Sequence, residues 1–118
     1  MDAEVLRQVR RCCFSLPEVT ERLSHGTPTF FVRDRKSFAQ LWDDHHGDGR
    51  LALWCAAPPG VQEALIAEEP TRFFRPPYVG PRGWLGVDLR REPDWDEFDA
   101  IVREAYRVVA PVSLARTV

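Results

Sequence analysis

The residues best suited to chemistry lie between positions 71 and 91, where arginines are interleaved with aromatic side chains. Arg75 and Arg82 flank Tyr78 and precede Trp84. A guanidinium group can hold a phosphate through paired N–H donors, and an aromatic ring can stack on a base. The pattern favours a nucleic-acid-binding surface; the alternative is a solvated surface whose arginines pair with nearby carboxylates. Five arginines stand in this stretch against one acid, Asp88: Arg72, Arg75, Arg82, Arg90 and Arg91.

A second group of reactive side chains is the run Asp-Asp-His-His-Gly-Asp at positions 43–48. Histidine and aspartate are metal-ligand types, but their spacing here fits neither an EF-hand nor a zinc site. Adjacent histidines on a loop also point apart. The sequence therefore predicts no bound metal.

Motifs for catalysis and for cofactor binding are missing. Ser24 and His25 lack the Gly-x-Ser-x-Gly context of a nucleophile elbow, and Gly80–Gly83 is too short for a phosphate-binding loop. Glu18 and Glu21 have no evident acid–base partner. We therefore predict no catalytic residues, no cofactor and no enzymatic activity.

Length and composition fit one domain, residues 1–118, because domains cluster around ~100–150 residues. The formal net charge is −2, so binding to nucleic acid would need a local basic patch. No apolar run approaches the ~18 residues that span a bilayer, and the acidic N-terminus is unlike a signal peptide. Cys12, Cys13 and Cys55 form no Cys-x-x-Cys pair and read as small buried hydrophobes. These features predict a cytoplasmic protein without a membrane partner.

Hydrophobic periodicity and turn residues predict three helices and about five strands. Short hairpin links require antiparallel pairing, so we expect an α+β fold with one antiparallel sheet and the N-terminal, middle and C-terminal helices on one face. Asp94 is expected to cap the last helix, and the proline-rich segment 73–81 to form a rigid extended loop. The expected helices are 2–14, 60–68 and 94–109, and the expected strands are 20–24, 29–33, 36–42, 50–55 and 83–89.

Alternation along the strands divides their side chains between two faces. The nearly pure apolar set should face the helices: Phe30, Val32, Ala39, Leu41, Leu51, Leu53, Cys55, Leu85, Val87 and Leu89. The other set mixes polar groups with large aromatics: Thr29, Phe31, Arg33, Phe38, Gln40, Trp42, Ala52, Trp54, Trp84, Gly86 and Asp88. An open face of this kind could stack on bases or other flat ligands. Alternatively, its aromatics pack on one another or under a loop and merely close the sheet.

Three blocks of the sequence together resemble the MmcQ/YjbR family. They are Gly26–Val32 followed by Lys36–Ala39, then Phe74–Trp84, and finally Glu104–Val109. The resemblance covers nearly the whole chain and implies a frataxin-like α+β fold and a DNA-binding role. Family members often carry Asn-Lys and a His just before the tryptophan, where this chain has Gly80, Pro81 and Gly83, which leaves Arg82 as the only charge. The frataxin-like fold that the resemblance implies also brings iron binding into question, and we discount it because the first helix is rich in arginine and lacks the acidic ridge that this role requires.

We therefore predict a non-enzymatic module that binds nucleic acid weakly and electrostatically. The alternative is a module that binds a small ligand or a protein partner on the same aromatic face. Salt separates the two, because phosphate binding weakens steeply with salt and apolar recognition does not. The expected binding residues are Arg33, Trp54, Arg75, Tyr78, Arg82 and Trp84.

Overall fold

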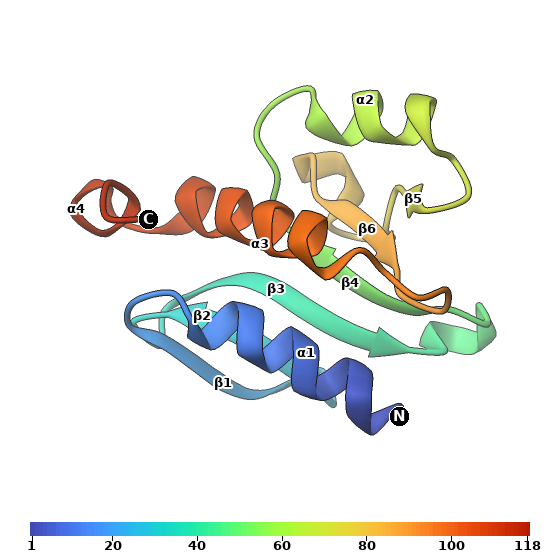
Figure 1. The fold of residues 1–118 in the computed structure, drawn as a ribbon, viewed down its shortest axis with the longest axis horizontal. Coiled ribbons are helices and arrows are strands. Elements are labelled where there is room, and N and C mark those ends of the chain that lie inside the picture. Colours follow the sequence, from blue (N-terminus) through green and yellow to red (C-terminus); the bar gives the residue numbers. More distant parts are fainter.

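A single antiparallel sheet of six strands organises the fold in the computed structural model, which describes residues 1–118 (Figure 1). The strand order across the sheet is β1-β2-β3-β4-β6-β5. Every neighbouring pair is antiparallel, as the short hairpin links predict. The strands are β1 (Val19–Ser24), β2 (Thr27–Val32), β3 (Lys36–Asp43), β4 (Leu51–Cys55), β5 (Phe73–Phe74) and β6 (Leu85–Asp88).

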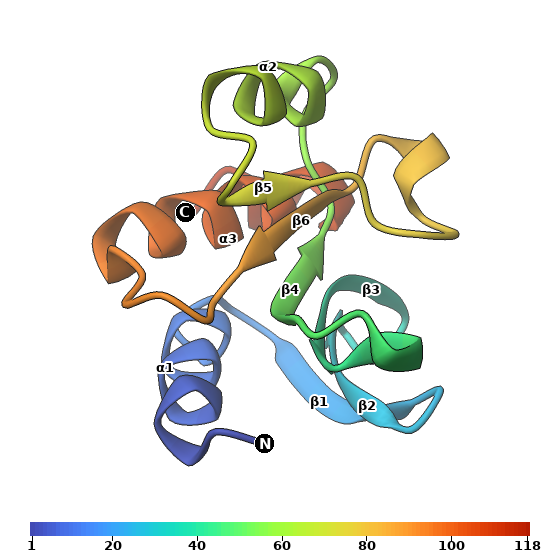
Figure 2. The same ribbon diagram turned by 90° about the vertical axis from the view of Figure 1, so that its right-hand side faces the viewer.

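Two of the helices lie together on one face of this sheet, and a third lies beside its β5–β6 edge (Figures 1 and 2). The face is covered by α1 (Ala3–Phe14) and α3 (Trp95–Val109), and the edge by α2 (Val61–Glu68). A short fourth helix, α4 (Val112–Ala115), follows α3. The longest helix, α3, has 15 residues and carries several charges, so the structure holds no candidate membrane-spanning helix.

The helix ends follow the capping residues in the sequence. The Asp2 carboxylate accepts hydrogen bonds from the backbone N–H groups of Glu4 and Val5, at 2.9 and 3.1 Å. The Asp94 carboxylate caps α3 in the same way, and one of its donors is the backbone N–H of Glu97. The side chain of Glu97 does not complete a capping box; instead it pairs with Arg72, beside β5. This pair ties the start of α3 to the sheet edge.

The α+β class and the single antiparallel sheet are confirmed, with one difference and two additions. The middle helix, α2, was expected on the same face as α1 and α3, but it lies beside the β5 edge of the sheet. The sixth strand, β5, is a two-residue strand within the stretch expected to be a proline loop, and α4 extends the C-terminal end. The β2–β3 turn is also displaced by one residue. Its central residues are Arg33 and Asp34, with φ of 54° and 56°, and the backbone N–H of Arg35 donates to Val32 O. Positive φ at both central positions is typical of a type I′ hairpin turn.

The apolar strand set forms the core against α1 and α3, as alternation predicts. Leu53 and Leu41 are fully buried, Val87 is buried across the register from Leu53, and Tyr106 of α3 packs in the same cluster. The hydroxyl of Tyr106 donates a hydrogen bond to Pro17 O at 2.7 Å, which links α3 to the α1–β1 connection. The predicted position of Leu53 in the shared core is confirmed.

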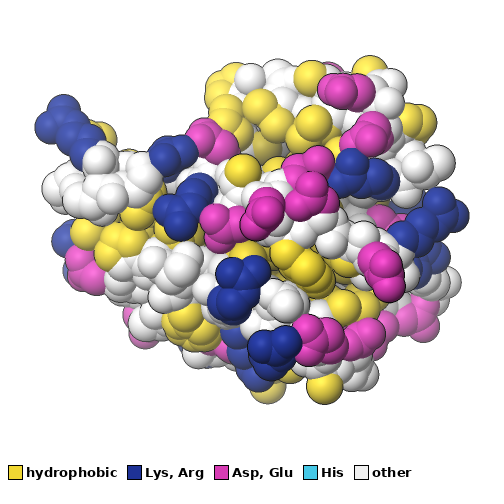
Figure 3. Space-filling model, viewed as in Figure 1, with side chains coloured by type: hydrophobic (Ala, Val, Ile, Leu, Met, Phe, Trp, Pro, Cys, Tyr) yellow, Lys and Arg dark blue, Asp and Glu magenta, His cyan; other side chains and the backbone are white.

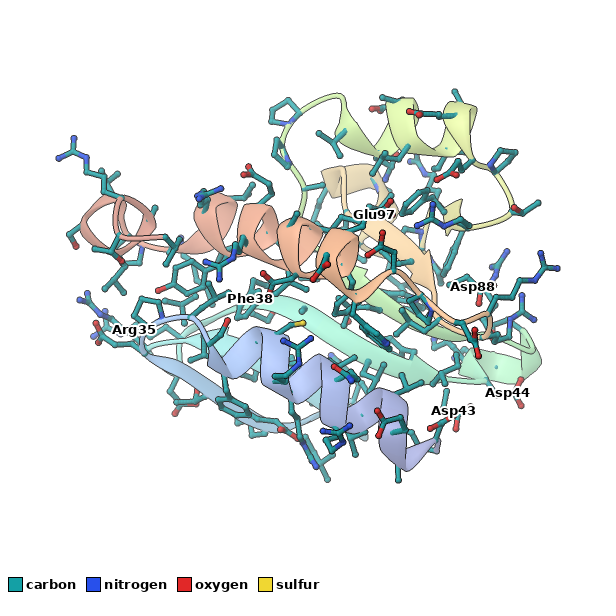
Figure 4. The ribbon with its side chains drawn as sticks, in the orientation of Figure 1. Arg35, Phe38, Asp43, Asp44, Asp88 and Glu97 are labelled. Carbon is teal, nitrogen blue, oxygen red and sulfur yellow. The ribbon has the colours of Figure 1, made fainter.

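Phe38 is on the opposite face from the one predicted. A bulge shifts the β2–β3 register between Phe30 and Phe31, so that Phe30 pairs with Ala39 while Phe31 pairs with Ser37. The extra residue, Phe38, turns toward α3 and makes an edge contact with the Tyr106 ring at 5.7 Å (Figure 4). A bulge breaks the strict alternation on which the face assignment rests.

The role of the core can be tested with two leucine substitutions. Leu53→Ala removes a fully buried side chain, and we expect it to lower the free energy of unfolding by ~2–5 kcal/mol. Leu23→Ala is the matched control, because Leu23 on β1 is 71% exposed and its loss should change stability by less than ~0.5 kcal/mol. Urea denaturation measures both. Equal effects of the two substitutions would contradict the assignment of the core face.

Candidate functional site

The segment that carries Arg75, Tyr78 and Arg82 joins β5 to β6, and we call residues 75–84 the arginine loop. Three prolines limit its backbone, and its 3-10 turn spans Gly80–Arg82. The buried side chain of Gln62 on α2 donates hydrogen bonds from Nε2 to two loop carbonyls, Gly80 O at 2.9 Å and Trp84 O at 2.5 Å. A buried amide that donates to two carbonyls fixes the loop against α2.

Arg75 and Arg82 are both exposed, and neither forms an ion pair. The stem of Arg75 lies against Gly80, where an added Cβ would stand only 2.7 Å from Arg75 Cγ. The guanidinium of Arg82 lies over the Trp84 ring at 5.3 Å. Packing therefore positions both side chains while their charges remain free for an anion.

Tyr78 lies between these arginines and is 75% exposed. Its φ is 64°, a left-handed conformation that bulky side chains rarely adopt. Such conformations persist when the surrounding structure imposes them, and they concentrate at binding sites. The loop thus holds an exposed aromatic ring in a defined place.

Trp54 and Trp84, expected on an open surface, are instead buried, with exposed fractions of 2% and 4%. The Trp54 ring packs against Trp42 with centroids 5.0 Å apart, and His45 covers it from the β3–β4 connection. For Trp54 the structure confirms the alternative prediction, that aromatic side chains of the mixed face pack on one another. Strand alternation assigns a side chain to a face, but it does not show whether a loop covers that face.

Arg33 lies apart from the other predicted site residues. It lies at the β2–β3 turn, where its guanidinium pairs with Glu18 at 3.0 Å. Figure 4 shows Arg35, in the same turn, at the opposite end of β3 from Asp43 and Asp44. The turn that holds Arg33 is therefore at the other end of β3 from Asp43 and Asp44, which line a cleft together with Tyr78 of the arginine loop.

A cleft of about 650 Å³ lies over the mixed face of the sheet, between the β1–β2 turn and the arginine loop, and we call it the aromatic cleft. The β3–β4 connection forms its third side through the 3-10 turn His45–Gly47. Tyr78 belongs both to this cleft and to the arginine loop. The lining residues are His25, Gln40, Trp42, Asp43, Asp44, His45, His46, Trp54, Tyr78 and Val79.

His45 is the residue of this cleft that sequence reasoning missed. Its ring lies 4.7 Å from the Trp42 ring, 4.8 Å from Trp54 and 6.0 Å from Tyr78, and all three contacts are edge-to-face. The two adjacent histidines stood out in the sequence, but their spacing indicated only that they do not form a metal site. Nothing in their spacing indicates that one of them packs across a tryptophan pair.

Trp54 Nε1 is the only buried side-chain polar atom of the protein without a hydrogen-bond partner. A buried donor left unpaired costs about 1–3 kcal/mol. Its neighbour Trp42 is satisfied, because Trp42 Nε1 donates to Gln40 Oε1 at 3.3 Å. A ligand with an acceptor atom can supply the hydrogen bond that this donor lacks.

The acidic side chains near the cleft have structural partners. Asp44 accepts a hydrogen bond from the backbone N–H of Gly49 at 2.7 Å, and Asp48 accepts one from Arg50 N–H at 2.9 Å. Asp43 pairs with the terminal ammonium of Met1 at 3.4 Å. The structure contains no group of three or more His, Cys, Asp or Glu side chains placed to hold a metal ion.

The three cysteines are free and buried. Burial raises the pKa of Cys12 to about 11 and that of Cys55 to about 12, and it raises the pKa of Cys13 as well. At neutral pH these thiols are protonated, and only a thiolate acts as a nucleophile. They behave as the small apolar side chains that the sequence suggests.

The helix-covered face offers no patch of a single charge. Figure 3 shows that basic and acidic side chains are interleaved across α1 and α3. Several of these are ion pairs, such as Arg7 with Glu4 and Arg103 with Asp99. The arginine loop differs from this face in carrying two exposed arginines without ion pairs, Arg75 and Arg82, in one short segment with the exposed Tyr78.

These features define a single-sheet α+β domain with a fixed arginine loop beside an aromatic cleft. The YjbR family model matches residues 14–108, and the chain therefore belongs to the YjbR family. A similar solved structure is protein DR2400 of Deinococcus radiodurans, described as a DUF419 domain, with a TM-score of 0.75. The two share 16% identity over 95% of this chain and 86% of the other, so the likeness shows the fold alone. The comparison with curated proteins gives no match.

The anchoring role of Gln62 can be tested by substitution. Gln62→Ala leaves Gly80 O and Trp84 O without their buried donor, and we expect a loss of about 1–3 kcal/mol in the free energy of unfolding. Amide exchange of the arginine loop should also become faster. Gln8→Ala on the outer side of α1 is the control and should change neither quantity. If Gln62→Ala leaves loop exchange at the wild-type rate, the loop is held by something else.

Proposed function

We propose that this YjbR domain is a non-enzymatic module that binds single-stranded nucleic acid weakly through its arginine loop. Arg75 and Arg82 contact backbone phosphates, and Tyr78 stacks on a base. The observation that supports this most directly is that one short loop carries two exposed arginines without ion pairs and, between them in the sequence, an exposed aromatic ring. Phosphate contacts and base stacking are the two components of sequence-tolerant single-strand binding.

A single strand suits this surface better than a duplex. Only an unpaired base can turn its face toward Tyr78, which is exposed beside a concave cleft. With a net charge of −2, the protein lacks the overall positive field typical of duplex binders. A short contact area with few phosphates implies dissociation constants of roughly 10⁻⁴–10⁻⁶ M at physiological salt.

The other expected site residues take different parts in this proposal. Trp84 supports the guanidinium of Arg82 from below and does not itself meet a base. Trp54 lies in the wall of the aromatic cleft. Arg33, paired with Glu18 at the far hairpin turn, has no part in binding.

The rival function, a module for a small ligand or a protein partner, would use the aromatic cleft without the arginines. Such binding buries apolar surface and depends little on salt, whereas phosphate binding releases counterions and weakens as salt rises. The salt dependence of affinity therefore distinguishes the two.

The proposal predicts the effect of removing the two loop charges. In the double variant Arg75→Gln, Arg82→Gln, the slope of log affinity against log salt for a labelled oligothymidylate should flatten by about 1.4, or ~0.7 per lost phosphate contact. The matched control is Arg35→Gln, Arg116→Gln, which removes the same charge from two exposed arginines at the hairpin turn and α4. Fluorescence anisotropy at two or more salt concentrations measures the slope.

Two results would contradict this assignment. If the folded protein at high concentration and low salt binds neither single- nor double-stranded DNA, the nucleic-acid function is wrong and the rival replaces it. If the control pair flattens the slope as much as the loop pair, binding depends on overall charge and not on the arginine loop.

A further inference from the structure

We infer that the aromatic cleft is a pocket for one unpaired base of the bound strand, recognised through the hydrogen-bond acceptors on its edge. This inference rests on the proposed function and adds to it a second component, a site for the base itself. The cleft and the arginine loop share Tyr78, so a strand whose phosphates meet Arg75 and Arg82 passes the mouth of the cleft.

The size and lining of the cleft suit a flat heteroaromatic ring. Its volume of about 650 Å³ lies within the ~300–1,000 Å³ of typical small-molecule sites. Trp42 and Tyr78 are aromatic residues of its lining, and the His45 ring contacts both, with centroids 4.7 Å from Trp42 and 6.0 Å from Tyr78. Aromatic walls of this kind stack on any base, whatever its identity.

The polar groups of the cleft favour a ligand that presents acceptors. Trp54 Nε1 is a donor without a partner. The amide oxygen of Gln40 already accepts from Trp42, which leaves its NH₂ group as a second free donor. Among the acceptors of the lining, Asp43 pairs through Oδ2 with the N-terminus and Asp44 accepts from Gly49 N–H through Oδ1. The carbonyl oxygens of a pyrimidine complement this set of free donors.

Entry of a base requires one ring of the wall to move, because Trp54 Nε1 has no contact with solvent. The rings that lie against Trp54 are Trp42, held in β3, and His45, held only by a 3-10 turn. The neighbours of His45 on both sides, Asp44 and His46, have left-handed φ values of 56° and 48°. We therefore expect a base to displace His45. In the free protein the His45 imidazole lies edge-to-face against the Trp54 ring.

The test compares three single strands of equal length on the wild-type protein. One is an oligothymidylate, the second carries difluorotoluene in place of thymine, and the third has abasic sites. Difluorotoluene keeps the shape of thymine but hardly accepts hydrogen bonds. We expect the oligothymidylate to bind about 5-fold or more tightly than the abasic strand, and roughly 2- to 10-fold more tightly than the difluorotoluene strand.

Two variants then locate the recognition. Trp54→Phe keeps a ring but removes the Nε1–H donor, and it should abolish the preference for thymine over difluorotoluene. Trp95→Phe, at the start of α3 and outside the cleft, is the matched control and should preserve that preference. His45→Ala vacates the position beside Trp54 and should bind the oligothymidylate at least as tightly as the wild type does.

The outcomes separate this inference from the proposed function. Equal, salt-dependent affinity for the thymine and abasic strands leaves phosphate binding in place and overturns the base pocket. Equal affinity for thymine and difluorotoluene overturns recognition by the Trp54 donor, and so does a preference that survives Trp54→Phe. A loss of affinity in His45→Ala contradicts the displacement of His45. Absence of binding to all three strands overturns the proposed function itself.

Discussion

The buried amide of Gln62 is the contact on which the geometry of the candidate site depends. It comes from α2, beside the sheet edge, and it holds two carbonyls of the arginine loop, at Gly80 and at Trp84. Backbone hydrogen bonds within the loop, such as Gly80 N–H to Pro76 O at 3.0 Å and Gly83 N–H to Gly80 O at 2.9 Å, shape its turns, and Gln62 joins these turns to α2. Because Gln62 fixes the loop at two points, Arg75, Tyr78 and Arg82 can present charge and ring surface together.

A second constraint acts at the same sheet edge, where Phe74 of β5 lies across Gly86 of β6. A Cβ at Gly86 would stand 2.5 Å from the Phe74 ring, so the residue must be glycine for this contact to form. The guanidinium of Arg50 also lies over the Phe74 ring, with 3.9 Å between Cζ and the ring centroid. Arg22 over Phe31 and Arg82 over Trp84 repeat the arrangement. The protein thus concentrates cations on one aromatic face although its net charge is −2.

Three helices and five of the six strands could be predicted from the sequence because its local signals agree with one another, whereas the two-residue strand β5 and the short helix α4 could not. Asp2 and Asp94 cap helices where their side chains predict, and hydrophobic alternation places Leu53 in the core. The prediction was wrong for Phe38, because a bulge adds one residue to β3 and reverses the direction of that side chain. A single-residue bulge leaves no clear mark in a hydrophobic pattern.

The candidate site was less predictable, because it depends on contacts between distant segments. Alternation correctly assigned Trp54 to the mixed face, but the turn that carries His45 covers it. Arg33 was assigned to the same face as a strand residue, but β2 ends at Val32 and Arg33 is a central residue of the β2–β3 turn, where it pairs with Glu18. The arginine loop itself was recognised because its residues are contiguous in the chain. The aromatic cleft was not, because three separate connections meet to form it.

The most direct test of this account is a ¹⁵N–¹H NMR titration with an oligothymidylate that follows the indole N–H signals of the four tryptophans. If a base binds in the aromatic cleft, the Trp54 signal should shift most, because its donor gains an acceptor, and the Trp42 signal and the backbone amide of Tyr78 should shift with it. The Trp95 indole, on α3, should stay unchanged. Shifts confined to Trp95, or to the β2–β3 turn around Arg33, would contradict the assignment of this loop and cleft as the binding site.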